Sequence, residues 1–233
     1  MTKSLVAGAL ALGVLGASNL SADVLIGAAG GYKKPLTQIM ANAKKAGIEV
    51  NAVFGHPKQM VQSASAGDLG LIVGDLDVLE KQKSVKIVKF TELGDGVLVF
   101  VSNKKIADLS EISNLKISYP QPPKTIYGKC ASEFLKNSNL KPKETLEVAS
   151  VPQVSTYVRS GDVDGGFVNI TEAIAQRDNG GFATQIIVDK TKYTVPKIVS
   201  ARTAACEKNA DCMKFDEFLK NEQSKKILKD YGL

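Results

Sequence analysis

Short apolar runs alternate along this chain with longer segments in which apolar residues recur at helical spacing. In the segment 35–46, for example, Leu36, Ile39, Met40 and Ala43 fall on one helical face. Such alternation of strands and helices is typical of parallel sheets that are flanked by helices. The pattern therefore predicts an α/β fold.

The boundaries of the expected elements follow from the same periodicity. The expected strands and extended runs are 24–28, 48–54, 69–73, 85–90, 96–102, 115–118, 146–151, 165–168, 184–188 and 193–201. The expected helices are 35–46, 57–66, 77–83, 126–136, 153–160, 171–177 and one long lysine-rich region, 211–231.

Two long extended runs, 96–102 and 193–201, enclose a complete α/β unit. A chain that crosses twice between two lobes would have this arrangement, and its crossing strands would form a hinge. We therefore expect lobe I to comprise 23–96 plus 197–233, and lobe II to comprise 97–196. A single continuous domain is the alternative that the pattern leaves open.

The N-terminus has the layout of a cleaved secretory signal peptide. Lys3 precedes an uncharged apolar run over 5–18, and small residues ending at Ala22 stand just before Asp23. The run is too short for a stable membrane span. We predict that 1–22 is a signal peptide and that the mature chain is exported to the periplasm.

Charge and composition narrow the partners. The formal net charge is +6, and it falls to +5 if Lys3 is removed. The charges are interspersed, tryptophan is absent and aromatic residues are few, which makes nucleic acid an unlikely partner. A mildly positive chain suits an anionic ligand. His56 is the only histidine, and we expect neither a zinc site nor a cofactor.

The three cysteines divide into two kinds. Cys206 and Cys212 enclose a polar, turn-forming stretch, and in an oxidising compartment they could close a small disulfide loop. Cys130 lies in a helical pattern and is interpreted as a small buried residue.

Candidate binding residues lie in loops that follow strands and precede helices. Such loops hold ligands in open α/β sheets, and helix starts offer unpaired N–H groups and partial positive charge to an anion. The loops with small or turn-forming residues are 27–31, 55–58, 121–125 and 150–153, and the lysines in or beside them are Lys33, Lys34, Lys58 and Lys124. Each loop alone is also consistent with an ordinary strand-to-helix turn.

Four stretches of the mature chain carry a family resemblance: Ala28-Ala29, Ile126-Tyr127-Gly128-Lys129, Gly165-Gly166-Phe167-Val168 and the C-terminal Tyr231-Gly232-Leu233. Together they resemble the periplasmic molybdate/tungstate-binding proteins of ABC importers. The resemblance implies the type II periplasmic-binding-protein fold, with two lobes joined by a two-strand hinge. It also implies a monomer that delivers a small anion to a membrane ABC permease.

The resemblance assigns positions to the ligand contacts. The first contact loop falls on Gly30 or Gly31 and the second on 56–58, where His56 and Lys58 replace the family's serines. The later contacts fall at Lys124, Val151 and Asn169. Because these residues differ from the family's, another oxyanion or a small carboxylate is an alternative ligand.

Two other classes of function are weighed against solute binding. An exported enzyme would need Cys130 or a serine as nucleophile and His56 as base, but the chain has no Gly-x-Ser-x-Gly elbow. The Gly-Gly and Gly-His-Pro loops also resemble accessory colonisation factors of the same fold, which would make this a periplasmic interaction protein with a vestigial cleft. We expect a binding protein without covalent chemistry.

Overall fold

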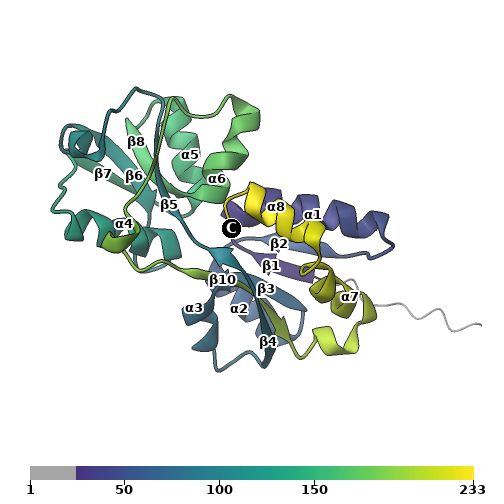
Figure 1. Cartoon of the computed structure of the whole chain (residues 1–233). Coiled ribbons are helices and arrows are strands. Elements are labelled where there is room, and N and C mark those ends of the chain that lie inside the picture. The colour runs from purple at the N-terminus through teal and green to yellow at the C-terminus, as the bar shows by residue number, and fades with distance from the viewer. Residues whose placement is uncertain (1–24) are drawn as a thin grey trace, which may run out of the picture.

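The computed structural model describes residues 25–233, so the expected signal peptide lies outside the described residues. The chain forms two five-stranded sheets, each covered by helices (Figure 1). We call sheet A with its helices lobe I, and sheet B with its helices lobe II. The expected two-lobed α/β class is confirmed.

Sheet A has the strand order β2-β1-β3-β10-β4, and its strands are β1 (Leu25–Ala28), β2 (Asn51–Phe54), β3 (Leu71–Asp75), β4 (Ile87–Asp95) and β10 (Lys197–Thr203). Sheet B has the order β7-β6-β8-β5-β9, and its strands are β5 (Leu98–Ser102), β6 (Lys116–Pro120), β7 (Glu144–Val148), β8 (Gly165–Asn169) and β9 (Thr184–Ile187).

Both sheets are mixed, which corrects the expectation of parallel sheets. β1 pairs in parallel with β2 and β3, and β6 pairs in parallel with β7 and β8. β10, however, is antiparallel to β3 and β4, and β5 is antiparallel to β8 and β9. These two strands lie next to the crossings between lobes, where the chain enters a sheet without a βαβ connection.

The helices cover both sheets. They are α1 (Lys33–Lys45), α2 (Pro57–Ala66), α3 (Leu76–Glu80), α4 (Ile126–Asn137), α5 (Val151–Ser160), α6 (Ile170–Ala175), α7 (Ala210–Phe218) and α8 (Glu222–Asp230), with short 3-10 turns η1 (Gly30–Tyr32), η2 (Leu109–Asn114), η3 (Gln176–Asn179), η4 (Lys190–Lys192) and η5 (Cys206–Lys208). In lobe I, α1 and α8 lie side by side.

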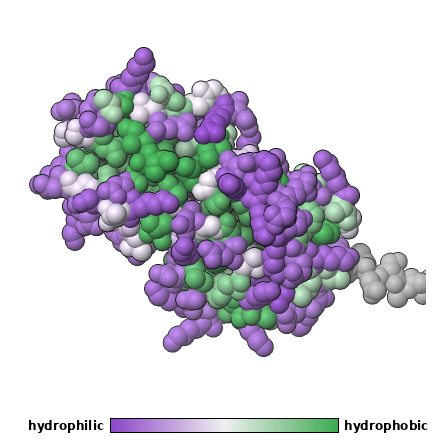
Figure 2. Space-filling model, viewed as in Figure 1, coloured by the Kyte–Doolittle hydropathy of each residue, from purple (hydrophilic) through white to green (hydrophobic). Residues whose placement is uncertain are grey.

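The helical region expected over 211–231 is two helices rather than one. The side chain of Asn221 accepts a hydrogen bond from the backbone N–H of Ser224, and the Ser224 hydroxyl donates to the carbonyl of Phe218. An asparagine in this role begins a new helix. The last helix, α8, buries Ile227 and Leu228, and the hydrophilic face of this part of lobe I is visible in Figure 2.

The interior follows the apolar pattern of the sequence. One large cluster of buried residues runs through both lobes and includes Ile26, Leu36, Phe100 and Phe167. A second, smaller cluster packs α2 and α3 against the other face of sheet A, with Met60 among its members. Burial of these apolar side chains is the main favourable contribution to folding.

The two crossings between the sheets are hydrogen-bonded to each other. The first joins β4 to β5 through Gly96 and Val97, and the second joins β9 to β10. The backbone N–H of Gly96 donates to the carbonyl of Pro196 at 2.7 Å. The exact lobe boundaries, after residues 96 and 196, stay a prediction.

The C-terminal part of lobe I is fixed by a disulfide and a buried ion pair. Cys206 and Cys212 form a disulfide with a Cα–Cα distance of 5.3 Å. Arg202 lies 3.3 Å from Asp216, whose side chain is fully buried. Within 25–233, no helix is long and apolar enough to cross a membrane.

Candidate functional site

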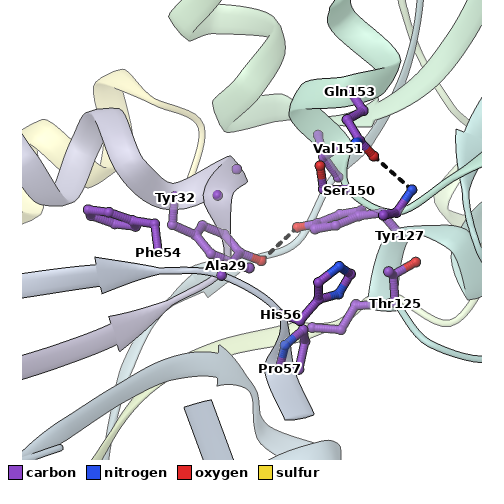
Figure 3. A pocket seen from close by; sticks show the side chains of 15 residues that line it. Ala29, Tyr32, Phe54, His56, Pro57, Thr125, Tyr127, Ser150, Val151 and Gln153 are labelled. Carbon is purple, nitrogen blue, oxygen red and sulfur yellow. Dashed lines mark hydrogen bonds between the residues drawn. The ribbon is translucent and has the colours of Figure 1, made fainter. Parts of the chain in front are cut away.

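A cavity of about 250 Å³ lies between the two lobes (Figure 3). It is lined by Ala29, Gly30, Gly31, Tyr32, Phe54, Gly55, His56, Pro57, Thr125, Ile126, Tyr127, Ala149, Ser150, Val151 and Gln153. Lobe I contributes the residues up to Pro57, and lobe II contributes the others. A ligand in this space would therefore contact both lobes.

Parallel pairing explains why these residues meet. β1 and β2 run in parallel and end at Ala28 and Phe54, just before η1 and α2. β6 and β7 run in parallel and end at Pro120 and Val148, just before α4 and α5. The carboxyl ends of parallel strands share one edge of a sheet, so each lobe presents two strand-to-helix loops to the other.

The loops direct the starts of three α-helices toward the cavity. α2 begins at Pro57, α4 at Ile126 and α5 at Val151, and all three residues line the cavity. The first N–H groups of a helix have no partner within the helix, and the helix start carries about half a positive elementary charge. Pro57 and Pro152 have no N–H, and the N–H of Gly128 is engaged by Thr125, so only the remaining N–H groups at these helix starts can stabilise an anion.

The polar side chains of the lining differ in what they can still bind. The Thr125 hydroxyl donates to the carbonyl of Gln121 at 2.9 Å and accepts from the N–H of Gly128 at 3.1 Å, so both of its functions are used. Ser150 precedes α5 without capping it through its side chain. In Figure 3, the His56 imidazole projects into the cavity below the Tyr127 ring. Ser150 and His56 are thus the side chains best placed to meet a ligand.

Two tyrosines join the lobes at one wall of the cavity. The hydroxyl oxygens of Tyr32 and Tyr127 are 3.1 Å apart and share a hydrogen bond, and both side chains are buried. Burial raises the pKa of both hydroxyls well above the ordinary value of 10.0. Both tyrosines are therefore neutral at physiological pH and offer a ligand no charge.

Asn169, expected as a ligand contact, lies behind the lining and not in it. Its side chain is fully buried, and its amide nitrogen donates to the carbonyl of Gly31 at 3.4 Å and to the Thr171 hydroxyl. A Cβ on Gly31 would come within 2.7 Å of the Asn169 Oδ1, so only glycine fits there. Asn169 thus helps to fix the Gly30–Tyr32 turn through its hydrogen bond to the carbonyl of Gly31.

The predicted site residues divide into two groups. Gly30, Gly31, His56 and Val151 line the cavity, whereas Lys58 and Lys124 are exposed and are not among its lining residues. Whether these two lysines contact a ligand stays a prediction. The sequence places Lys58 near the start of α2, but its side chain lies on the solvent-exposed face of that helix.

The lining therefore contains no lysine, arginine, aspartate or glutamate among the described residues. A carboxyl group, that of Asp75, lines a second cavity of about 30 Å³ that shares Ala29, Pro57 and Ile126 with the first. Burial raises the pKa of Asp75, although a hydrogen bond from the N–H of Val78 opposes part of this shift.

Sequence reasoning missed Tyr32, Phe54, Thr125, Tyr127, Ser150 and Gln153 as individual lining residues. Thr125, Ser150 and Gln153 lie in loops that were singled out, so the loop pattern contained the signal. Tyr32 and Tyr127 lie at helix starts, where an aromatic residue is as easily interpreted as core. Pattern alone does not say which lobe a tyrosine faces.

Of the residues named for the enzyme alternative, His56 and one serine, Ser150, line this cavity, whereas Cys130 does not. Burial raises the pKa of the Cys130 thiol to about 12, and Cys130 is not among the lining residues. A thiol in this state is a poor nucleophile, because the thiolate is the reactive form. Residues 25–233 also hold no group of three or more His, Cys, Asp or Glu side chains arranged to hold a metal ion.

Comparison with known proteins agrees with this architecture. The profile of a family described as bacterial extracellular solute-binding protein matches residues 24–233. A comparison with curated proteins found no match.

Three solved structures show the same fold. A periplasmic molybdate-binding protein of Azotobacter vinelandii matches with a TM-score of 0.79 and 20% identity, covering 90% of this chain and 98% of that one. The substrate-binding domain of a putative molybdenum ABC transporter from Clostridium difficile matches with a TM-score of 0.69 and 23% identity, covering 90% and 97%. PEB3 of Campylobacter jejuni with L-phospholactate bound matches with a TM-score of 0.71 and 17% identity, covering 90% and 98%.

Proposed function

Because this chain belongs to the bacterial extracellular solute-binding proteins, we propose that it captures a small anion in the cavity between its lobes. The carrying observation is that three α-helix starts from the two lobes reach one cavity whose described lining has no lysine, arginine, aspartate or glutamate. Backbone N–H groups favour an anion without the cost of burying an unpaired lysine.

The proposed setting is the periplasm, and the proposed acceptor is a membrane ABC permease. Two observations support this setting: the export-like N-terminal sequence and the likeness to proteins titled as a periplasmic molybdate-binding protein and as part of a molybdenum ABC transporter. Closure of the lobes over the anion would give the loaded protein a different conformation from the empty one. Binding of this kind needs no covalent step.

A thermal-shift panel tests the ligand class. The probes are molybdate, tungstate, sulfate, phosphate and small carboxylates, with neutral sugars as controls at matched ionic strength. A ligand of the native state raises the melting temperature in a concentration-dependent way. Stabilisation by a neutral sugar and by none of the anions would overturn the proposal.

A charge-reversal variant tests the location. Gln153→Glu places a carboxylate of the same size in the lining, and Gln153 is exposed enough for the fold to tolerate it. We expect the affinity for the stabilising anion to fall about tenfold, which corresponds to ~1.4 kcal/mol. Gln38→Glu makes the same charge change on the exposed face of α1 and should leave the affinity unchanged. Equal effects of the two variants would place the anion elsewhere.

A further inference from the structure

The lining of the cavity between the lobes has two chemically different parts. The helix starts, Ser150 and His56 form a polar part, and Thr125 adds nothing to it because its hydroxyl is already engaged. The remainder is apolar or aromatic and includes the rings of Phe54 and Tyr127.

The polar part has few free side-chain donors, namely those of Ser150, His56 and the Gln153 amide group. The hydroxyls of Tyr32 and Tyr127 share a hydrogen bond, and the side-chain carbonyl of Gln153 accepts from the N–H of Ala149 at 2.8 Å. A bare tetrahedral oxyanion has four oxygens on all sides and needs donors around its whole surface. In this cavity the donors share the lining with apolar and aromatic side chains, among them Phe54, Ile126 and Val151.

The volume of the cavity also favours a ligand larger than a bare oxyanion. A water molecule takes about 30 Å³ of liquid, so a five-atom oxyanion needs at most roughly 150 Å³. The cavity holds about 250 Å³, which leaves room for a few further atoms. A bare ion would leave the apolar wall without contacts, and those lost contacts are unfavourable.

Resting on the proposed function, we infer that the ligand is an organic anion and not a bare inorganic oxyanion. Its single compact oxyanionic head lies against the helix starts, Ser150 and His56. Its small uncharged hydrocarbon body, bringing the whole to about eight non-hydrogen atoms, lies against Phe54, Ile126 and Tyr127.

Titration calorimetry with head-matched probe pairs tests this inference. The pairs are phosphate with propyl phosphate, sulfate with propanesulfonate, and formate with butyrate. In the pair whose head the site accepts, we expect the alkyl member to bind more tightly by about fourfold for each buried methylene. The pair that responds identifies the head group.

Two variants separate the parts of the site. Ile126→Thr keeps the β-branched shape but adds a hydroxyl to the apolar wall, so it should reduce the preference for the alkyl member. Ser150→Ala removes a head-group donor, so it should weaken both members of a pair and leave their ratio unchanged. Retention of the native fold is checked by circular dichroism.

The outcomes are distinguishable. If the inorganic members bind as tightly as the alkyl members, or more tightly, the inference is overturned and the proposed anion-binding function stands. If propanol binds and no anion does, or if no probe binds at all, both the inference and the proposed function are overturned. An unchanged alkyl preference in Ile126→Thr would remove the apolar wall from the ligand's contacts.

Discussion

The hydroxyl oxygens of Tyr32 and Tyr127 share a hydrogen bond at 3.1 Å, and this bond joins the turn after β1 in lobe I to the start of α4 in lobe II. The two residues are separated by 95 positions in the sequence, and both line the cavity. The bond can exist only while the lobes are together, so it stabilises the closed arrangement.

Tyr32→Phe removes this bond and keeps the ring. We expect the free energy of unfolding to fall by about 1 kcal/mol, the usual net contribution of a hydrogen bond. We also expect the ligand-free protein to be more open, with a larger radius of gyration in small-angle X-ray scattering. Tyr157→Phe, at an exposed position on α5, is the control and should change neither quantity. Identical scattering of the two variants would show that the bond does not hold the lobes together.

The buried tyrosines predict a loss of stability at high pH. Burial raises the pKa of Tyr32 and Tyr127 in the folded chain above the ordinary value of 10.0. Their contribution is therefore complete below pH 10, and it is lost as the pH rises toward the folded-state pKa, because the unfolded chain releases its protons first. Denaturant unfolding at a series of pH values, followed with tyrosinate absorbance, measures this. The double variant Tyr32→Phe/Tyr127→Phe should show a shallower decline, and an equally steep one would contradict the assignment.

Gly30→Ala should oppose closure of the lobes. A Cβ on Gly30 would lie 3.1 Å from the Cγ of Pro152 in α5 of lobe II, which is tighter than an ordinary contact. We expect the affinity for the tightest-binding anion of the panel to fall about tenfold in calorimetry, because the closed state is overpacked. Unfolding should change little, since the lobes can separate.

Pro152→Ala removes the opposing carbon atoms and provides the control for this effect. In the double variant Gly30→Ala/Pro152→Ala, most of the lost affinity should return. If the double variant binds the anion as weakly as Gly30→Ala alone, the added methyl group acts within lobe I and not through contact with Pro152 of lobe II.

Among the substitutions proposed here, Asp216→Ala should lower the free energy of unfolding most. The Asp216 carboxylate is fully buried, 3.3 Å from Arg202, and accepts a hydrogen bond from the Thr91 hydroxyl at 3.4 Å. Removing the carboxylate leaves Arg202 with Glu207, 3.4 Å away, as its remaining ion-pair partner, so we expect a loss of about 1.5–3 kcal/mol, the contribution of a hydrogen bond to a charged group. Urea unfolding measures the difference. Glu222→Ala breaks the exposed pair with Lys225 and should cost less than about 1 kcal/mol.

The fold was accessible to sequence reasoning because its signals are local. Apolar periodicity located α1 and α2, and the two long extended runs located the crossings between lobes. The antiparallel pairing of β10 was not accessible, because a strand's pattern records which face is buried but not which neighbour it joins. The break at Asn221 was missed because an asparagine is tolerated in a helix as well as at its start.

The residues of the cavity could be predicted from the sequence only in part, for a related reason. The glycine, proline and hydroxyl residues before helices marked the loops that meet there, including Ser150. Lys58 and Lys124 lie beside these loops but outside the lining, because a loop position does not specify the direction of a long side chain. The Tyr32–Tyr127 bond depends on two lobes meeting, and no local pattern contains that information.

The position of β10 between β3 and β4 has a consequence for how the chain matures. Sheet B is built from one uninterrupted stretch, and all of its strands exist once residue 187 has emerged. In sheet A, the position between β3 and β4 stays unfilled until residues 197–203 have emerged. The later lobe in sequence can therefore fold first, as a template, and the earlier lobe must wait for the end of the chain.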